Sequence, residues 1–226
     1  MKVAFAVSCN NLYVNCLFAL LKSIVKNDPD FNYDFWVIDS GLSDINKEKM
    51  RGIYSNIMFK SYDETIYHEH RKENLKYRSI EMFSITGYDK VIQLGADCIL
   101  LNPVTDLVNE ECDIGMPREK LRNNMFSSGI MIIGKKYLNK ETYMGLLKAS
   151  YDKVVMFGTD MKLYNCYFND NITEIDYHYN VMVSEHTLPE WDLGKTIFLH
   201  YCHKPQATRD KLPMYLYELW DGYFNG

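Results

Sequence analysis

Short apolar runs alternate with amphipathic stretches through residues 1–100 of the chain. The apolar runs have the length and the β-branched and aromatic content of buried strands, and the stretches between them repeat apolar positions at helical spacing. This order favours parallel strands joined by right-handed helical crossovers. We expect strands at Val3–Val7, Tyr33–Asp39, Asn56–Tyr62 and Lys90–Leu94, and helices at Leu12–Lys26, Ser43–Tyr54 and around Tyr77–Gly87.

The rest of the chain is more mixed and predicts an α/β protein with a mixed sheet. A polar stretch at Asp63–Asn74 separates two of the elements above, and the terminal helix, rich in Tyr, Leu and Trp, either caps the core or contacts another domain. The later elements are expected as strands at Asp113–Met116, Phe126–Ile133, Ile172–Ile175 and Thr196–Tyr201, and helices at Asn139–Tyr151, Thr159–Phe168 and Pro213–Tyr223.

Composition and charge restrict the class of protein. A chain of 226 residues can bury one sizeable core, so we expect a single domain. The net charge of −5, with both signs interspersed, argues against a nucleic-acid partner and against attachment to an anionic membrane. No apolar run reaches the ~18 residues of a membrane span. Six cysteines without a C-x-x-C pair are typical of reduced thiols, so we expect a cytoplasmic location.

Two side chains that follow apolar runs are candidate metal ligands. Asp97 comes after the run at Lys90–Leu94, and His200 ends the run that starts at Thr196. Ligands of open α/β sheets bind outside the carboxyl ends of the strands, and carboxylate and imidazole are both common metal ligands. Each residue alone is more often structural, as a turn aspartate or a satisfied core histidine.

Five sequence blocks strengthen this interpretation: FAVSCNNLY (5–13), FWVIDSGLS (35–43), YDKVIQLGAD (88–97), FSSGIMII (126–133) and HYCHKP (200–205). Together and in this order they resemble family 8 glycosyltransferases, retaining enzymes that include bacterial galactosyltransferases and glycogenin. The resemblance implies the GT-A fold, with a Rossmann-like nucleotide-binding half (residues 1–100) and a sugar and acceptor half (residues 101–226) in one domain. It implies a hexosyltransferase that moves a sugar from a nucleotide-sugar donor, a UDP-sugar, to a glycan, a protein-linked glycan or another hydroxyl acceptor.

The resemblance also assigns roles to single residues. Asp97 and His200 would hold a divalent cation, with Mn²⁺ expected and Mg²⁺ the alternative, against the donor phosphates. Arg78 and Lys204 would face the same phosphates. Asp160 would hold sugar hydroxyls near the reacting carbon and, with Arg78, is an expected catalytic residue. The remaining donor-site positions would be Ala6, Ser8, Asn10, Tyr13, Ala96 and Ser127.

Several positions depart from the family pattern. Gly95 replaces the first aspartate of the D-x-D motif, so one carboxylate ligand is missing, and Met161 replaces the glutamine that follows Asp160. A thioether neither donates a hydrogen bond nor serves as a useful nucleophile, which argues against a covalent intermediate at this position and favours front-face substitution. His203, where a glycine is common, is either a phosphate donor or an exposed loop residue, and we favour the second.

Two alternatives remain. A degenerate transferase that binds a nucleotide sugar or a glycan without turnover would explain Gly95 and Met161. A nucleotidyltransferase would also place carboxylates beside a Rossmann-like sheet, but the chain lacks a glycine-rich phosphate loop.

Overall fold

The computed structural model describes residues 1–61, 75–121, 125–151 and 159–226. The polar stretch expected at Asp63–Asn74 lies outside these residues. Two β-sheets organise the described part of the chain, a large mixed sheet of seven strands and a small sheet of three.

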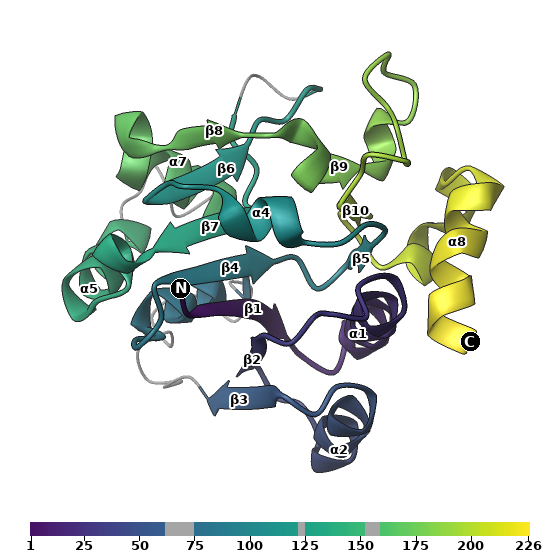
Figure 1. The fold of residues 1–226 in the computed structure, drawn as a ribbon, viewed down its shortest axis with the longest axis horizontal. Helices are drawn as coiled ribbons and strands as arrows, with labels where there is room; N and C mark the ends of the chain where they lie inside the picture. The colour runs from purple at the N-terminus through teal and green to yellow at the C-terminus, as the bar shows by residue number, and fades with distance from the viewer. Residues whose placement is uncertain (62–74, 122–124, 152–158) are drawn as a thin grey trace.

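The large sheet has the strand order β3-β2-β1-β4-β7-β6-β8, which Figure 1 shows from bottom to top. The four strands from β3 to β4 are parallel, as expected for the nucleotide-binding half, whereas β7 pairs antiparallel with both β4 and β6. The mixed sheet is therefore confirmed. Its strands are β1 (Val3–Cys9), β2 (Asp34–Asp39), β3 (Ile57–Ser61), β4 (Lys90–Leu94), β6 (Ile114–Pro117), β7 (Ile130–Gly134) and β8 (Thr173–Ile175).

Helices cover both faces of this sheet. Apolar side chains of α1, among them Leu17 and Leu20, pack with Phe5 and Phe35 of the strands in one core, and η1, α5 and α7 close a second core on the other face. The α-helices are α1 (Val14–Asn27), α2 (Asp44–Ile53), α4 (Thr105–Asn109), α5 (Lys140–Ser150), α7 (Asp160–Phe168) and α8 (Met214–Asn225). The 3₁₀ helices are η1 (Leu75–Ser84), η2 (Lys135–Tyr137), η3 (Asn169–Asn171), η4 (Tyr177–Tyr179), η5 (Val183–Glu185) and η6 (Pro205–Lys211).

The small sheet joins β5 (Cys98–Leu100), β10 (Phe198–His200) and β9 (Val181–Met182). Helix α8 lies beside α1 (Figure 1) and buries Leu216 and Trp220 in a third core with β5 and β10. The terminal helix therefore caps the core, one of the two roles expected for it. Among the described residues, no helix combines the length and apolar content that a membrane crossing requires.

Three sequence predictions are corrected here. The helix expected around Tyr77–Gly87 is the 3₁₀ helix Leu75–Ser84, and the strand expected from Phe126 begins only at Ile130 because Phe126 makes an isolated bridge to Arg118. The strand expected at Thr196–Tyr201 is shorter and belongs to the small sheet, where its partner β5 was not predicted.

Candidate active site

A turn between the two sheets carries the principal carboxylate of the site. Strand β4 ends at Leu94, the chain turns through Gly95, Ala96 and Asp97, and it enters β5 of the small sheet at Cys98. Asp97 thus follows β4, as the sequence indicates, and also directly precedes β5, which was not predicted. The Gly95 amide donates to the Gly129 carbonyl oxygen (2.7 Å), and the Asp97 carbonyl oxygen accepts from the Tyr201 amide (3.0 Å). The turn is therefore attached to both sheets.

The pairing of β5 with β10 brings Asp97 and His200 together. His200 lies opposite Cys98 in this antiparallel pair, and its Nε2 lies 3.2 Å from Oδ1 of Asp97. Both side chains are only 13% exposed. Burial by itself lowers the pKa of His200, but the adjacent Asp97 carboxylate outweighs it and leaves that pKa above its ordinary value.

The donor atoms at this point suit a divalent cation. Asp97, Cys98 and His200 each offer one ligand atom, and the three atoms lie within 4.8 Å of one another. Burial raises the pKa of the Cys98 thiol well above its ordinary range, and a thiolate is a soft ligand that suits Mn²⁺ and Mg²⁺ poorly. Asp97 and His200 therefore fit as the protein ligands, and oxygen plus imidazole nitrogen suits Mn²⁺.

Gly95 occupies a crowded position beside this pair. A Cβ built on Gly95 would lie 3.2 Å from each of three atoms, Oδ1 of Asp97, Sγ of Cys98 and Nε2 of His200. Only Gly41 and Gly87 have a positive φ among the described glycines. The limit on a side chain at Gly95 is therefore space and not backbone conformation.

A cavity of about 490 Å³ opens at this edge of the large sheet. The cavity lining includes residues from each of the five sequence blocks, with Ser40 from the block 35–43. Of the predicted site residues, the cavity is lined by Ser8, Asn10, Tyr13, Ala96, Asp97, Ser127, Asp160 and His200. His203, the replacement for a glycine, is exposed and also lines the cavity.

Three predicted residues lie outside the cavity lining. Ala6 is fully buried within β1. Arg78 is half-buried on η1, and its Nη1 donates to the carbonyl oxygen of Ser40, a lining residue (3.3 Å). Lys204 places its Nζ 5.6 Å from the ring centre of Tyr13, which lines the cavity. Arg78 and Lys204 therefore lie next to the cavity, because each contacts a residue that lines it. The roles of Ala6, Arg78 and Lys204 stay predictions.

Asp160 is held in place by neighbouring hydroxyl and amide groups. It is the first residue of α7, where the partial positive charge of the helix terminus favours a carboxylate. Its Oδ1 accepts from the Ser128 hydroxyl (3.2 Å) and the Met161 amide (2.8 Å), and its Oδ2 accepts from the Ser79 hydroxyl (3.2 Å). These bonds fix the carboxylate from η1, from the segment before β7 and from its own helix.

Comparison with known proteins shows the family to which the chain belongs. The family model described as glycosyl transferase family 8 matches residues 4–205. The chain belongs to this family. Glycosyltransferase GlyF of Streptococcus pneumoniae is 24% identical over 201 residues, which is 81% of this chain and 50% of GlyF. The chain therefore spans about half the length of this curated relative.

Solved structures confirm the GT-A fold. Galactosyltransferase LgtC in complex with donor and acceptor sugar analogs superposes with a TM-score of 0.80 at 18% identity, covering 98% of this chain and 95% of LgtC. The apo form of glycosyltransferase GlyE of Streptococcus pneumoniae superposes with a TM-score of 0.81 at 15% identity, covering 99% of this chain and 60% of GlyE.

The sequence analysis of this family 8 chain missed several cavity residues. One signal was available, because Gln93 is a polar residue inside the apolar run at Lys90–Leu94, and it is 3% exposed. Ser79, Ser128, Thr159 and Cys202 lie close to predicted site residues in the sequence, whereas nothing local marks Glu119 and Met182. The missed lining residues include Ser79, Gln93, Glu119, Ser128, Thr159, Met182 and Cys202.

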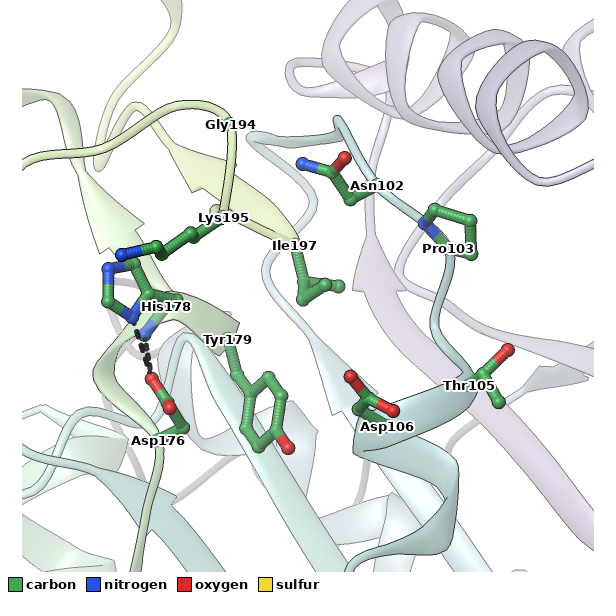
Figure 2. A pocket seen from close by; sticks show the side chains of 10 residues that line it. All are labelled: Asn102, Pro103, Thr105, Asp106, Asp176, His178, Tyr179, Gly194, Lys195 and Ile197. Carbon is green, nitrogen blue, oxygen red and sulfur yellow. Dashed lines mark hydrogen bonds and ion pairs between the residues drawn. The ribbon is translucent and has the colours of Figure 1, made fainter.

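A second cavity of about 480 Å³ lies at the opposite end of the small sheet (Figure 2). Its polar side chains include Asp106, Asp176 and Lys195, which are exposed, and the His178 ring lies 2.9 Å from Asp176. None of the predicted site residues lines this cavity. The cavity beside Asp97 and His200 is therefore the candidate active site.

Proposed function

We propose that this family 8 chain is a retaining, metal-assisted glycosyltransferase that moves a sugar from a UDP-sugar to a hydroxyl of a glycan. The observation that supports this most is the approach of Asp97 to His200 in the cavity that Asp160 also lines. LgtC, which shares the fold, was crystallised with donor and acceptor sugar analogs, which supports a donor and an acceptor here.

The nucleoside would bind at the turn after β1. Asn10 shapes this turn, because its Oδ1 accepts from the amides of Leu12 (2.9 Å) and Tyr13 (3.3 Å). The Tyr13 ring then faces the cavity, where a base can stack on it. Ser8 and Ala96 would complete the nucleoside side of the site, and the buried Ala6 would support it from within β1, where it pairs with the lining residue Gln93.

The diphosphate would lie between the cation ligands and the two basic side chains that border the cavity. Lys204 offers a point charge, and Arg78 offers a planar fork that suits phosphate oxygens. Asp97 and His200 would hold the cation, Mn²⁺ or Mg²⁺. When bound, the cation neutralises charge on the departing diphosphate as a Lewis acid.

The sugar would lie between Asp160 and the cation ligands. The fixed Asp160 carboxylate can accept hydrogen bonds from sugar hydroxyls, and Ser127 can contribute its hydroxyl proton, since its Oγ already accepts from Gly129 and Asn180. Met161 offers no nucleophile, so we propose front-face substitution. The bond from the anomeric carbon to phosphate breaks, the acceptor oxygen bonds on the same face, and the leaving phosphate takes the acceptor proton.

We further propose that residues 1–226 form one glycosyltransferase domain, with a nucleotide-binding half in 1–100 and a sugar and acceptor half in 101–226. All six cysteines are unpaired thiols, which supports a cytoplasmic location.

Turnover of UDP-sugars tests this function. The chain would be incubated with UDP-glucose, UDP-galactose or UDP-N-acetylglucosamine and Mn²⁺, and released UDP measured with and without chelator. We expect metal-dependent release from at least one donor, lost in Asp97→Asn and kept in the control Asp106→Asn, which changes an exposed residue of the second cavity. Metal-dependent UDP binding without any turnover would favour the degenerate binding protein, and absence of UDP binding would contradict the proposed function.

A further inference from the structure

Two buried atoms beside the proposed cation site have no hydrogen-bond partner among the described residues. They are Nδ1 of His200 and Oδ1 of Asn180. Asn180 is 3% exposed and directly precedes β9, the strand that runs parallel to β10 and aligns Met182 with His200. Buried polar atoms in native proteins nearly always have partners, so two such atoms in one place require an explanation.

Gly129 shows that these two atoms face the same small space. A Cβ built on Gly129 would lie 2.4 Å from Nδ1 of His200 and 2.8 Å from Oδ1 of Asn180. Both distances are too short for any side chain larger than hydrogen. The absence of a side chain at Gly129 therefore leaves open the path between the imidazole and the amide oxygen.

The Asn180 amide has a hydrogen-bond partner at its other end. Its Nδ2 donates to Oγ of Ser127 (3.0 Å), and the same Oγ accepts from the Gly129 amide (3.3 Å). In this orientation the Ser127 hydroxyl keeps its own proton for a sugar oxygen, whereas in the reversed orientation the Asn180 oxygen would take that proton. The Asn180 oxygen and Nδ1 of His200 then both border the position that a Gly129 side chain would occupy.

The tautomer of His200 decides whether Nδ1 can donate to the Asn180 oxygen. Nε2 of His200 lies 3.2 Å from an Asp97 oxygen, so without a cation the ring proton of a neutral imidazole is best placed on Nε2. Nδ1 then carries a lone pair and faces the Asn180 oxygen, another acceptor. A cation bound to Asp97 and His200 would take the Nε2 lone pair, and the ring proton would reside on Nδ1, where the Asn180 oxygen can accept it.

We propose that Asn180 is the positioning residue of His200, accepting Nδ1–H so that the Nε2 lone pair faces the cation. This inference rests on the proposed metal-assisted function and adds to it a residue outside the cation's own ligands. Partners of this kind fix the tautomer and orientation of metal-binding histidines, and their loss commonly lowers metal affinity about 10–100-fold.

Nitrogen NMR of the wild-type protein gives a first test that does not depend on activity or on a variant. Ring-labelled histidine would be observed without metal and with Mg²⁺ and UDP, and the His200 signals identified by their loss in His200→Gln. We expect the Nε2–H tautomer without metal near neutral pH wherever the ring is neutral, and the Nδ1–H tautomer with Mg²⁺ and UDP. An Nε2–H tautomer in the loaded protein would overturn the proposal.

Two variants give a second test, with affinity for Mn²⁺ in the presence of UDP measured from the signal of free Mn²⁺ in electron paramagnetic resonance. Asn180→Leu removes the acceptor at similar size and should weaken Mn²⁺ binding about 10–100-fold. Asn180→Asp keeps an acceptor and should stay within a few-fold of wild type. Asn102→Leu removes a half-buried amide with two carbonyl partners far from the site and should leave Mn²⁺ affinity unchanged.

The outcomes separate this inference from the proposed function. Wild-type protein that binds no Mn²⁺ with UDP would overturn the metal-assisted function and the positioning role with it. Normal Mn²⁺ binding by wild type and equally tight binding by Asn180→Leu would overturn the positioning role alone. Equal losses in Asn180→Leu and Asn180→Asp would also overturn it, because the acceptor would then not matter.

Discussion

Lys204 and Tyr13 meet at the edge of the active-site cavity, although Lys204 belongs to the last of the five sequence blocks and Tyr13 to the first. The Lys204 ammonium lies 5.6 Å from the centre of the Tyr13 ring, within the range of a cation–π contact. The contact places a positive charge next to the ring proposed to stack on the base. Tyr13 would therefore bind the base and Lys204 the phosphates of one nucleotide, and the two side chains also contact each other.

Replacing Lys204 by Met should weaken binding of UDP more than binding of uridine. The variant keeps an apolar stem against Tyr13 but removes the charge, and a hydrogen bond to a charged group contributes about 1.5–3 kcal/mol, roughly a ten- to hundred-fold change in Kd. Calorimetry with both ligands measures the difference. Lys211→Met, an exposed change on the same 3₁₀ helix, is the control. Equal losses for UDP and uridine would place Lys204 away from the phosphates.

Replacing Asp160 by Asn should slow transfer while leaving UDP affinity unchanged, because the carboxylate is proposed to contact the sugar. The loss of one charged hydrogen bond, about 1.5–3 kcal/mol, predicts a kcat/KM roughly ten- to hundred-fold lower for the sugar donor. Steady-state kinetics measures the loss of kcat/KM, and calorimetry with UDP measures whether the affinity for UDP is unchanged. Asp170→Asn, an exposed change beyond α7, should behave as wild type. A large loss of UDP affinity in Asp160→Asn would assign Asp160 to the nucleotide.

The missing D-x-D carboxylate can be tested by comparing Gly95→Asp with Gly95→Ala. Both variants add the same Cβ, which would crowd Asp97, Cys98 and His200 at 3.2 Å, so both require a small shift of these groups. Only Asp adds a further oxygen ligand. Mn²⁺ in the presence of UDP should bind more tightly to Gly95→Asp than to Gly95→Ala, measured by calorimetry. Equal affinities would mean that a carboxylate at this position does not reach the cation.

The Asp39 carboxylate should make part of the free energy of unfolding depend on pH in the acid range. Burial by itself raises the pKa of Asp39, but Lys47 Nζ at 2.6 Å and the amides of Leu42 and Gly41 outweigh it and lower that pKa. A lowered folded-state pKa means that the stabilisation is present above the unfolded-state pKa of about 3.9 and is lost as pH falls through the folded-state value.

Asp39→Asn should therefore lower the free energy of unfolding at pH 7 by about 1–3 kcal/mol. The difference from wild type should shrink as the pH falls below about 4. Urea unfolding at a series of pH values measures it, with the exposed Asp30→Asn as control. A difference that does not change with pH would show that the Asp39 charge is not its cause.

The nucleotide-binding half could be predicted from sequence because its signals are local. Each strand from β1 to β4 is a short apolar run, and Ser43, where the second helix was expected to begin, caps that helix because its side chain accepts from the Asn46 amide. The positions of Asp97 and His200 near strand ends were also visible in the sequence. Their approach to each other was an implication of the family resemblance.

The small sheet could not be predicted, because its pairing joins segments about a hundred positions apart through strands of two or three residues. Such strands have too few residues for a periodic pattern. Asn180 illustrates the consequence, since its sequence neighbours predict no role and only the pairing of β9 with β10 brings it to His200. The strand predicted from Phe126 was too long at its start. An apolar residue beside a strand does not show where the hydrogen bonds to the neighbouring strand begin.

The turn at Gly95–Asp97 is where the chain leaves one sheet and enters the other, and the two sheets share no strand pair among the described residues. A nucleotide sugar bound by Ser8 and Asn10 on one side and by His200 on the other would span this junction. Binding of the nucleotide sugar would then also stabilise the arrangement of the two sheets relative to each other. The small sheet would therefore be more stable with substrate bound than without it. Hydrogen exchange of the backbone amides in β5 and β10 would slow while substrate is bound.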